Sequence, residues 1–204
     1  MAKERLKSPR ARLFVALDLP DEVREGIVAW QRGIDDPALR PVKPESLHMT
    51  LAFLAYHPEK EIERIADAAL GVDMPAPEVR LEPDPVGVPK GKRPRLFALD
   101  APSEGAVELQ RRVEERLVQG GFYEPEKRPF WPHLTVARVK PERRGSRKPA
   151  LVESPPGPLP ERLFRPFAAL RLTLYRSHLR PQGAEYVPLA GKDLEPATRK
   201  TKET

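Results

Sequence analysis

The strongest constraint on the fold of this chain is a pattern that occurs twice in its 204 residues. The segment RLFVALDLP at 12–20 returns as RLFALDAP at 95–102, and each copy is a short apolar run of strand-forming residues that ends in Asp and Pro. A helix with one apolar stripe is predicted after each copy. A second strand then begins with His-x-Thr, as HMTLA at 48–52 and HLTVA at 133–137. Because this order recurs at nearly constant spacing, the sequence indicates an internal duplication.

The remaining segments are predicted to complete two similar lobes. The periodic patterns predict helices over 21–34, 58–70 and 103–119, a Pro-interrupted edge strand over 78–88, and strands over 167–175 and 183–189. Residues 141–160 are predicted to form a long surface loop. We therefore expect one α+β domain over 1–190, bilobal and pseudo-two-fold, with interleaved lobes of roughly 12–88 and 95–190. A polar, frayed tail is expected over 191–204.

Composition removes several classes of function. The chain has no cysteine, which excludes disulfide scaffolds, thiolate zinc sites, iron-sulfur clusters and thiol nucleophiles. Its apolar runs are too short for a signal peptide or a membrane span, so we expect a cytoplasmic protein that does not bind membranes. Lys and Arg number 36 against 30 Asp and Glu, an excess that favours phosphorylated or nucleic-acid partners. A solvated surface explains the same excess, so charge alone leaves both interpretations open.

Two of the four histidines occupy equivalent places in the duplication. Side chains at i and i+2 of a strand share a face, so His48 points the same way as Thr50, and His133 the same way as Thr135. If the lobes are related by an approximate two-fold axis, both pairs converge on one cleft. Two imidazoles can accept and donate protons during phosphoester hydrolysis, and hydroxyls can hold the phosphate, without a metal or cofactor. One His-x-Thr is a weak signal, but its duplication in matching context favours a catalytic pair.

The same segments carry a family resemblance. The chain resembles the 2H phosphoesterases, in particular the RNA 2',3'-cyclic phosphodiesterases, also called 2'-5' RNA ligases. The similar segments are RLFVALDLP (12–20), KPESLHMTLAFL (43–54), PHLTVAR (132–138), LTLYRS (172–177) and GAEY (183–186). The resemblance implies two antiparallel sheets that face a central cleft, with the helices outside. It further implies opening of a terminal 2',3'-cyclic phosphate to a 2'-phosphate, and 2'-5' ligation in reverse.

The resemblance also assigns roles to residues of this chain. His48 would protonate the departing 3'-oxygen and His133 would activate water, while Thr50 and Thr135 hold the phosphate. Arg138 matches a family arginine for phosphate or RNA binding, although its odd offset from His133 puts it on the opposite strand face unless the strand bulges.

Two aromatic residues before the second motif are RNA-contact candidates. Phe130 and Trp131 could stack on a terminal base, and core packing explains them at least as well. The basic segments 90–95 and 143–148 could track an RNA backbone, or could simply be solvated loop charges.

The expected partner is an RNA end with a 2',3'-cyclic phosphate, tRNA halves included, bound by a monomer. Two alternatives stay open at this stage: a phosphodiesterase of the same superfamily that acts on small cyclic nucleotides, and an RNA-binding protein whose histidines no longer turn over.

Overall fold

A computed structural model describes residues 9–180 and 183–196 of the protein, and this part contains ten strands and three α-helices. The strands are β1 (Arg10–Asp18), β2 (Leu39–Pro41), β3 (His48–Pro58), β4 (Glu78–Val79), β5 (Val86–Val88), β6 (Leu96–Asp100), β7 (His133–Val139), β8 (Phe167–Ala168), β9 (Arg171–Arg180) and β10 (Gly183–Asp193). The helices are α1 (Asp21–Gln31), α2 (Ile62–Leu70) and α3 (Glu104–Gln119), with 3-10 turns η1 (Pro44–Ser46), η2 (Glu59–Glu61) and η3 (Glu161–Leu163).

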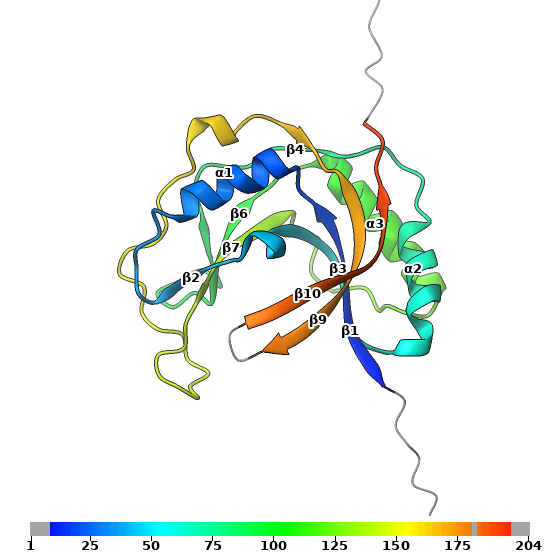
Figure 1. The fold of residues 1–204 in the computed structure, drawn as a ribbon, viewed down its shortest axis with the longest axis horizontal. Coiled ribbons are helices and arrows are strands. Elements are labelled where there is room, and N and C mark those ends of the chain that lie inside the picture. Colours follow the sequence, from blue (N-terminus) through cyan, green and yellow to red (C-terminus); the bar gives the residue numbers. More distant parts are fainter. Residues whose placement is uncertain (1–8, 181–182, 197–204) are drawn as a thin grey trace, which may run out of the picture.

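The strands form two four-stranded antiparallel sheets and one short pair (Figure 1). The first sheet has the order β10-β9-β1-β3, the second has the order β2-β7-β6-β5, and β4 pairs with β8. The α+β fold class with antiparallel sheets is therefore confirmed. The sheets do not follow the predicted lobes of 12–88 and 95–190, because β9 and β10 complete the first sheet, and β2 and β5 belong to the second.

The two copies of the repeat have the same strand pairing. In the first copy β1 runs antiparallel to β3 and places Asp18 opposite His48. In the second copy β6 runs antiparallel to β7 and places Asp100 opposite His133. The two sequence copies therefore form the same pair of strands in the same register.

Both pairs also contain a β-bulge at the same point. The register shifts by one residue after Thr50 in β3 and after Thr135 in β7, so that Leu51 and Val136 are the extra residues. A bulge inverts the alternation of side chains beyond it. In both strands two consecutive residues then face the core, and the next side chain returns to the face of the histidine.

The helices are exchanged between the two halves. Helix α1 follows β1 in the chain but lies on the second sheet (Figure 1), where Gln31 Nε2 donates to the backbone oxygen of Val136 over 2.7 Å. Helices α2 and α3 pack on each other and on the first sheet, where α3 contacts β3 and α2 contacts β9 and β10. Ser103 caps α3 by accepting from the Ala106 N–H over 3.0 Å. None of the described helices is long and apolar enough to cross a membrane.

Several predicted boundaries are wrong. The strand predicted over 78–88 is broken into β4 and β5, which belong to different sheets, because its prolines cannot donate backbone hydrogen bonds. The strand predicted over 167–175 is likewise split between β8 and β9. Helix α2 begins only at Ile62, because β3 continues to Pro58 and η2 follows. Strand β2 was not predicted, since three residues carry no readable period.

The prediction of a frayed tail from Gly191 onward is wrong for the first residues of that segment. Strand β10 continues to Asp193 along β9, Leu194 is buried, and the Ala76 N–H donates to the Glu195 oxygen over 2.7 Å. Pairing with β9 orders this segment despite its polar composition. Residues 197–204 lie outside the described residues.

A buried carboxylate connects α1, β2 and the long loop over 141–160. Asp36 accepts the backbone N–H of Ala38 at one oxygen and those of Glu153 and Ser154 at the other, each over 2.8 Å. These bonds, with that from Ser154 the strongest, lower the pKa of Asp36 below its ordinary 3.8. Asp36 thus holds the approach to β2, which carries part of the pocket described below.

We predict that Asp36→Ala lowers the free energy of unfolding by about 2 kcal/mol, because three backbone N–H groups lose one shared, charged acceptor. Since the folded-state pKa is lowered, the contribution is present above pH 3.8 and is lost as the pH falls below it. Urea unfolding at pH 7 and pH 3 measures both effects. Asp35→Ala, at the exposed neighbour, is the control, and equal losses in the two variants would contradict the prediction.

Candidate active site

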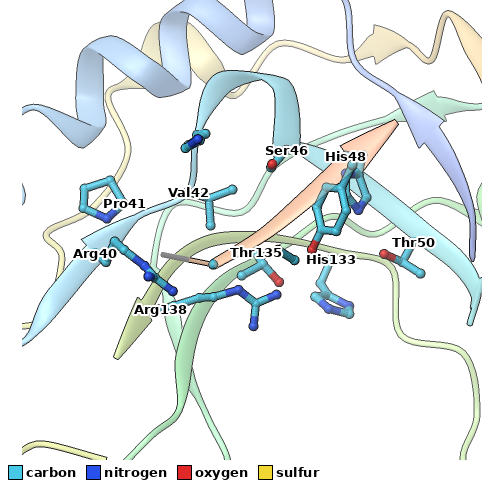
Figure 2. Close-up of a pocket in the computed structure, with 13 residues that line it drawn as sticks. Arg40, Pro41, Val42, Ser46, His48, Thr50, His133, Thr135 and Arg138 are labelled. Carbon is cyan, nitrogen blue, oxygen red and sulfur yellow. The ribbon is translucent and has the colours of Figure 1, made fainter. Parts of the chain in front are cut away.

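A cavity of about 240 Å³ lies between the two sheets and collects the residues predicted to be functional. His48 and Thr50 reach it from β3, and His133, Thr135 and Arg138 reach it from β7 (Figure 2). The rest of the lining comes from β2, η1 and the start of β10: Arg40, Pro41, Val42, Lys43, Ser46, Gly183, Ala184 and Tyr186. The cavity therefore brings together the two His-x-Thr motifs.

The His48 ring is half-buried within a cluster of aromatic rings. Its centroid lies 5.0 Å from that of Phe14 and 5.8 Å from that of Tyr175, both stacked, and 5.3 Å from Tyr186, edge to face. Burial among these rings lowers the pKa of His48 to about 3, and the positive charges of Arg138, Arg24 and His133 lower it further. In the ligand-free protein His48 is therefore neutral at pH 7.

His133 is held by a stacked ring and a backbone acceptor. The centroids of Trp131 and His133 are 4.1 Å apart with nearly parallel planes, and His133 Nδ1 lies 2.7 Å from the Trp131 backbone oxygen. A carbonyl oxygen only accepts, so Nδ1 carries a proton and the neutral ring keeps its lone pair on Nε2. Burial lowers the pKa of His133, while the Trp131 oxygen and Asp100 oppose that shift.

The bulge in β7 resolves the position of Arg138. Strict alternation from His133 puts Arg138 on the opposite face of the strand. The extra residue Val136 inverts the alternation, and Arg138 lines the same cavity as His133 and Thr135 (Figure 2). The first copy has Phe53 at the same offset, and it lines two adjoining cavities. The two halves thus present an arginine and an aromatic ring at equivalent places.

The two aromatic RNA-contact candidates lie beside the central cavity. Phe130 and Trp131 line an adjoining cavity of about 570 Å³, which shares Thr50 and His133 with the central one. Phe130 also packs against the core, whereas Trp131 is 37% exposed. The two residues therefore lie next to the central cavity, on the side of His133.

A second adjoining groove, of about 400 Å³, extends on the side of His48. It contains the guanidinium groups of Arg12, Arg40, Arg138 and Arg180, and no carboxylate occurs among its described lining residues. Arg12 donates to Ser177 Oγ over 2.7 Å and lies 4.3 Å above the Phe53 ring. The groove is therefore positively charged and continuous with the central cavity.

Sequence reasoning missed several of the lining residues. Arg12 and Tyr186 lie in the segments 12–20 and 183–186, whose similarity to the family was the available signal, whereas nothing in the pattern singled out Arg40. Gly183 has φ +125°, and a Cβ there would lie 3.3 Å from the Arg40 guanidinium. Glycine at this position thus allows the close approach of Arg40.

The two basic segments do not line the central cavity. Arg93 donates to the Pro149 oxygen over 2.8 Å and pairs with Glu142 at 3.2 Å, and Lys148 pairs with Glu142 at 2.9 Å. These charges hold the segments 90–95 and 143–148 to each other. Among the described residues there is no cluster of three or more His, Asp or Glu side chains that could hold a metal ion.

One cavity contains two half-buried imidazoles, a threonine two residues after each, and several cationic side chains. This arrangement defines a phosphoesterase of the two-histidine class. A sequence model of the protein family described as "LigT like Phosphoesterase" matches residues 17–97. The Escherichia coli RNA 2',3'-cyclic phosphodiesterase is 32% identical over 179 residues, which are 87% of this chain and 93% of that protein. The chain belongs to this LigT-like family of 2H phosphoesterases.

A further relative and a solved structure agree with this placement. The RNA 2',3'-cyclic phosphodiesterase of Methanocaldococcus jannaschii is 28% identical over 86% of this chain and 96% of that protein. The crystal structure of E. coli LigT complexed with 3'-AMP matches the fold with a TM-score of 0.71 and 28% identity, over 91% of this chain and 99% of that one.

We predict that the His48 ring stays neutral from pH 8 to pH 5 in the free protein, because its pKa is lowered to about 3. A nucleoside 2'-phosphate should raise this pKa, since a bound anion stabilises the imidazolium. NMR titration of the His48 ring, with and without the nucleotide, measures both values. A free-protein midpoint near 6.5 would contradict the burial argument.

Proposed function

We propose that this protein opens the 2',3'-cyclic phosphate at an RNA 3' end and leaves a 2'-phosphate. The observation that carries the proposal is the convergence of His48 and His133, each with its threonine, on one cavity that also contains Arg138. The curated relatives at about 30% identity are named RNA 2',3'-cyclic phosphodiesterase, which supports the same reaction for this chain.

The geometry around each histidine supports a distinct role. His133 is held with its proton on Nδ1, so Nε2 can take a proton from water as the water oxygen attacks phosphorus. The nearby Asp100 favours the imidazolium that results. As the bond from phosphorus to the 3'-oxygen breaks, His48 gives its proton to that oxygen. Because the free His48 is neutral, it takes up this proton when the anionic diester binds.

The remaining side chains hold the phosphate. The hydroxyls of Thr50 and Thr135 can donate to its nonbridging oxygens from opposite sides of the cavity, and Arg138 supplies positive charge. If the 5'-hydroxyl of a second RNA end replaces water, the same groups form a 2'-5' linkage. The cavity therefore supports both hydrolysis and ligation.

Two features favour an RNA end over a small cyclic nucleotide. The arginine-lined groove continues away from the central cavity, in position for a polyanionic backbone. On the other side, Phe130 and Trp131 border a cavity where a terminal base can stack. An RNA fragment such as a tRNA half supplies both a base and further phosphates, whereas a small cyclic nucleotide leaves the groove empty.

We predict that His48→Ala and His133→Ala each lower turnover by at least about a hundredfold, the usual contribution of one acid or base. An oligonucleotide that ends in a 2',3'-cyclic phosphate, assayed with EDTA, reports turnover through the appearance of the 2'-phosphate. Circular dichroism checks that the variants fold. An unchanged rate in either variant would exclude that histidine from the mechanism. If the wild-type protein binds the RNA without turnover, the non-catalytic alternative is favoured.

We predict that Arg12→Gln lowers kcat/KM for a ten-nucleotide RNA by about tenfold, and leaves a mononucleotide 2',3'-cyclic phosphate within about twofold of wild type. Because one phosphate contact is lost, the slope of log affinity for the RNA against log salt concentration should also become shallower by about one. Arg112→Gln, on the outer face of α3, is the charge-matched control. Equal effects of Arg12→Gln on both substrates would favour the small-nucleotide alternative.

A further inference from the structure

Each histidine lies beside an aromatic ring that is tied to an aspartate. On the first sheet Tyr175 donates its hydroxyl to Asp18 Oδ1 over 2.7 Å and stacks on both Phe14 and His48. The other oxygen of Asp18 accepts from the buried Thr173 hydroxyl, also over 2.7 Å. The carboxylate thereby holds the Tyr175 ring beside His48.

The second histidine has the same arrangement with a different aromatic residue. Trp131 Nε1 donates to Asp100 Oδ1 over 2.5 Å, and the indole stacks on His133. The Trp131 backbone also supplies the oxygen that His133 Nδ1 contacts. Asp100 thus holds the ring that supports His133, and with it the residue that fixes the proton on Nδ1.

The aspartates are equivalent in the repeat, but the aromatic residues are not. Asp18 and Asp100 end the first strand of each copy and lie opposite the two histidines in the same register. Tyr175 comes from β9, whereas Trp131 lies two residues before the start of β7. The feature that both halves share is therefore an aspartate that accepts a hydrogen bond from an aromatic N–H or O–H group.

We propose that Asp18 and Asp100 are positioning residues, each of which orients one histidine through the aromatic ring that it holds. This inference rests on the proposed function for its kinetic consequence. The two halves differ in what the aspartate controls. Asp18 controls the plane of His48, while Asp100 controls both the plane of His133 and the backbone acceptor for its Nδ1 proton.

The kinetic test asks whether each aspartate acts through its own histidine. On a mononucleotide 2',3'-cyclic phosphate, Asp100→Ala should lower kcat about tenfold and change KM less than about twofold, since a misplaced base slows proton transfer without weakening binding. In the His133→Ala background Asp100→Ala should have no further effect. In the His48→Ala background it should again lower kcat about tenfold.

The first sheet provides the reciprocal test. Tyr175→Phe keeps the stacked ring and removes only the hydroxyl that donates to Asp18, so the buried Thr173 hydroxyl keeps its acceptor. This variant should lower kcat in the wild-type and His133→Ala backgrounds. It should leave kcat unchanged in the His48→Ala background. Equal losses in both histidine backgrounds, or no loss in wild type, would overturn the proposal.

Two further variants separate positioning from general stability. Asp100→Asn keeps an oxygen acceptor for Trp131 Nε1 and should recover most of the activity that Asp100→Ala loses. Trp30→Phe removes the other indole N–H of the chain, which donates to the Pro158 oxygen over 3.1 Å, and should leave kcat unchanged. Failure of Asp100→Asn to recover activity would count against the hydrogen bond as the cause.

A measurement without turnover keeps this inference distinct from the proposed function. Nitrogen NMR of the His133 ring should show the Nδ1–H tautomer in wild type and a mixture of tautomers in Asp100→Ala. If the histidine variants retain full activity but the tautomer changes, the proposed mechanism fails and the positioning role stands. An unchanged tautomer in Asp100→Ala would overturn the positioning role itself.

Discussion

The antiparallel pairing within each copy of the repeat is the constraint on which the site depends. Because β1 and β3 pair in the same register as β6 and β7, each histidine lies opposite an aspartate and its threonine lies two residues further along the same face. The bulge that follows then turns the next side chain, Phe53 or Arg138, back to the face of the histidine. A shift of one residue in either pairing would move a histidine to the opposite face of its sheet and remove it from the cavity.

The electrostatics of the cavity follow from what surrounds these strands. Aromatic rings bury His48 and make its charged form costly, while Arg40 of β2, Lys43 just before η1 and Arg138 of β7 line the same space. A cavity lined by these cations, with no carboxylate among its described lining residues, favours an anionic ligand. In the proposed mechanism a bound phosphodiester adds negative charge beside these cations and favours a proton on His48. The aspartates beside the histidines do not line this cavity, so they can act on the histidines without repelling the phosphate.

The exchange of helices explains how two sheets remain fixed on either side of one cavity. Helix α1 packs on the sheet of the second copy, and α3 packs on the sheet of the first, so each half of the chain covers the other. The buried side chains form one continuous cluster that includes Leu13, Leu17, Leu99 and Leu134. The two histidines are therefore carried by strands of a shared core, and side chains attached to such strands can hold the sub-ångström placement that proton transfer requires.

The sequence by itself determined the repeat, the presence of the three helices and the shared face of each histidine with its threonine, because these depend on residues close together in the chain. The family segments also located the two motifs. Only the tertiary structure decided the direction of Arg138, which follows from a bulge set by the neighbouring strand, and the break of 78–88 into two sheets. The same is true of the contact between Asp18 and Tyr175, which are 157 residues apart. Periodicity reports which side of an element is apolar, but it carries no information on which distant segment will lie against that side.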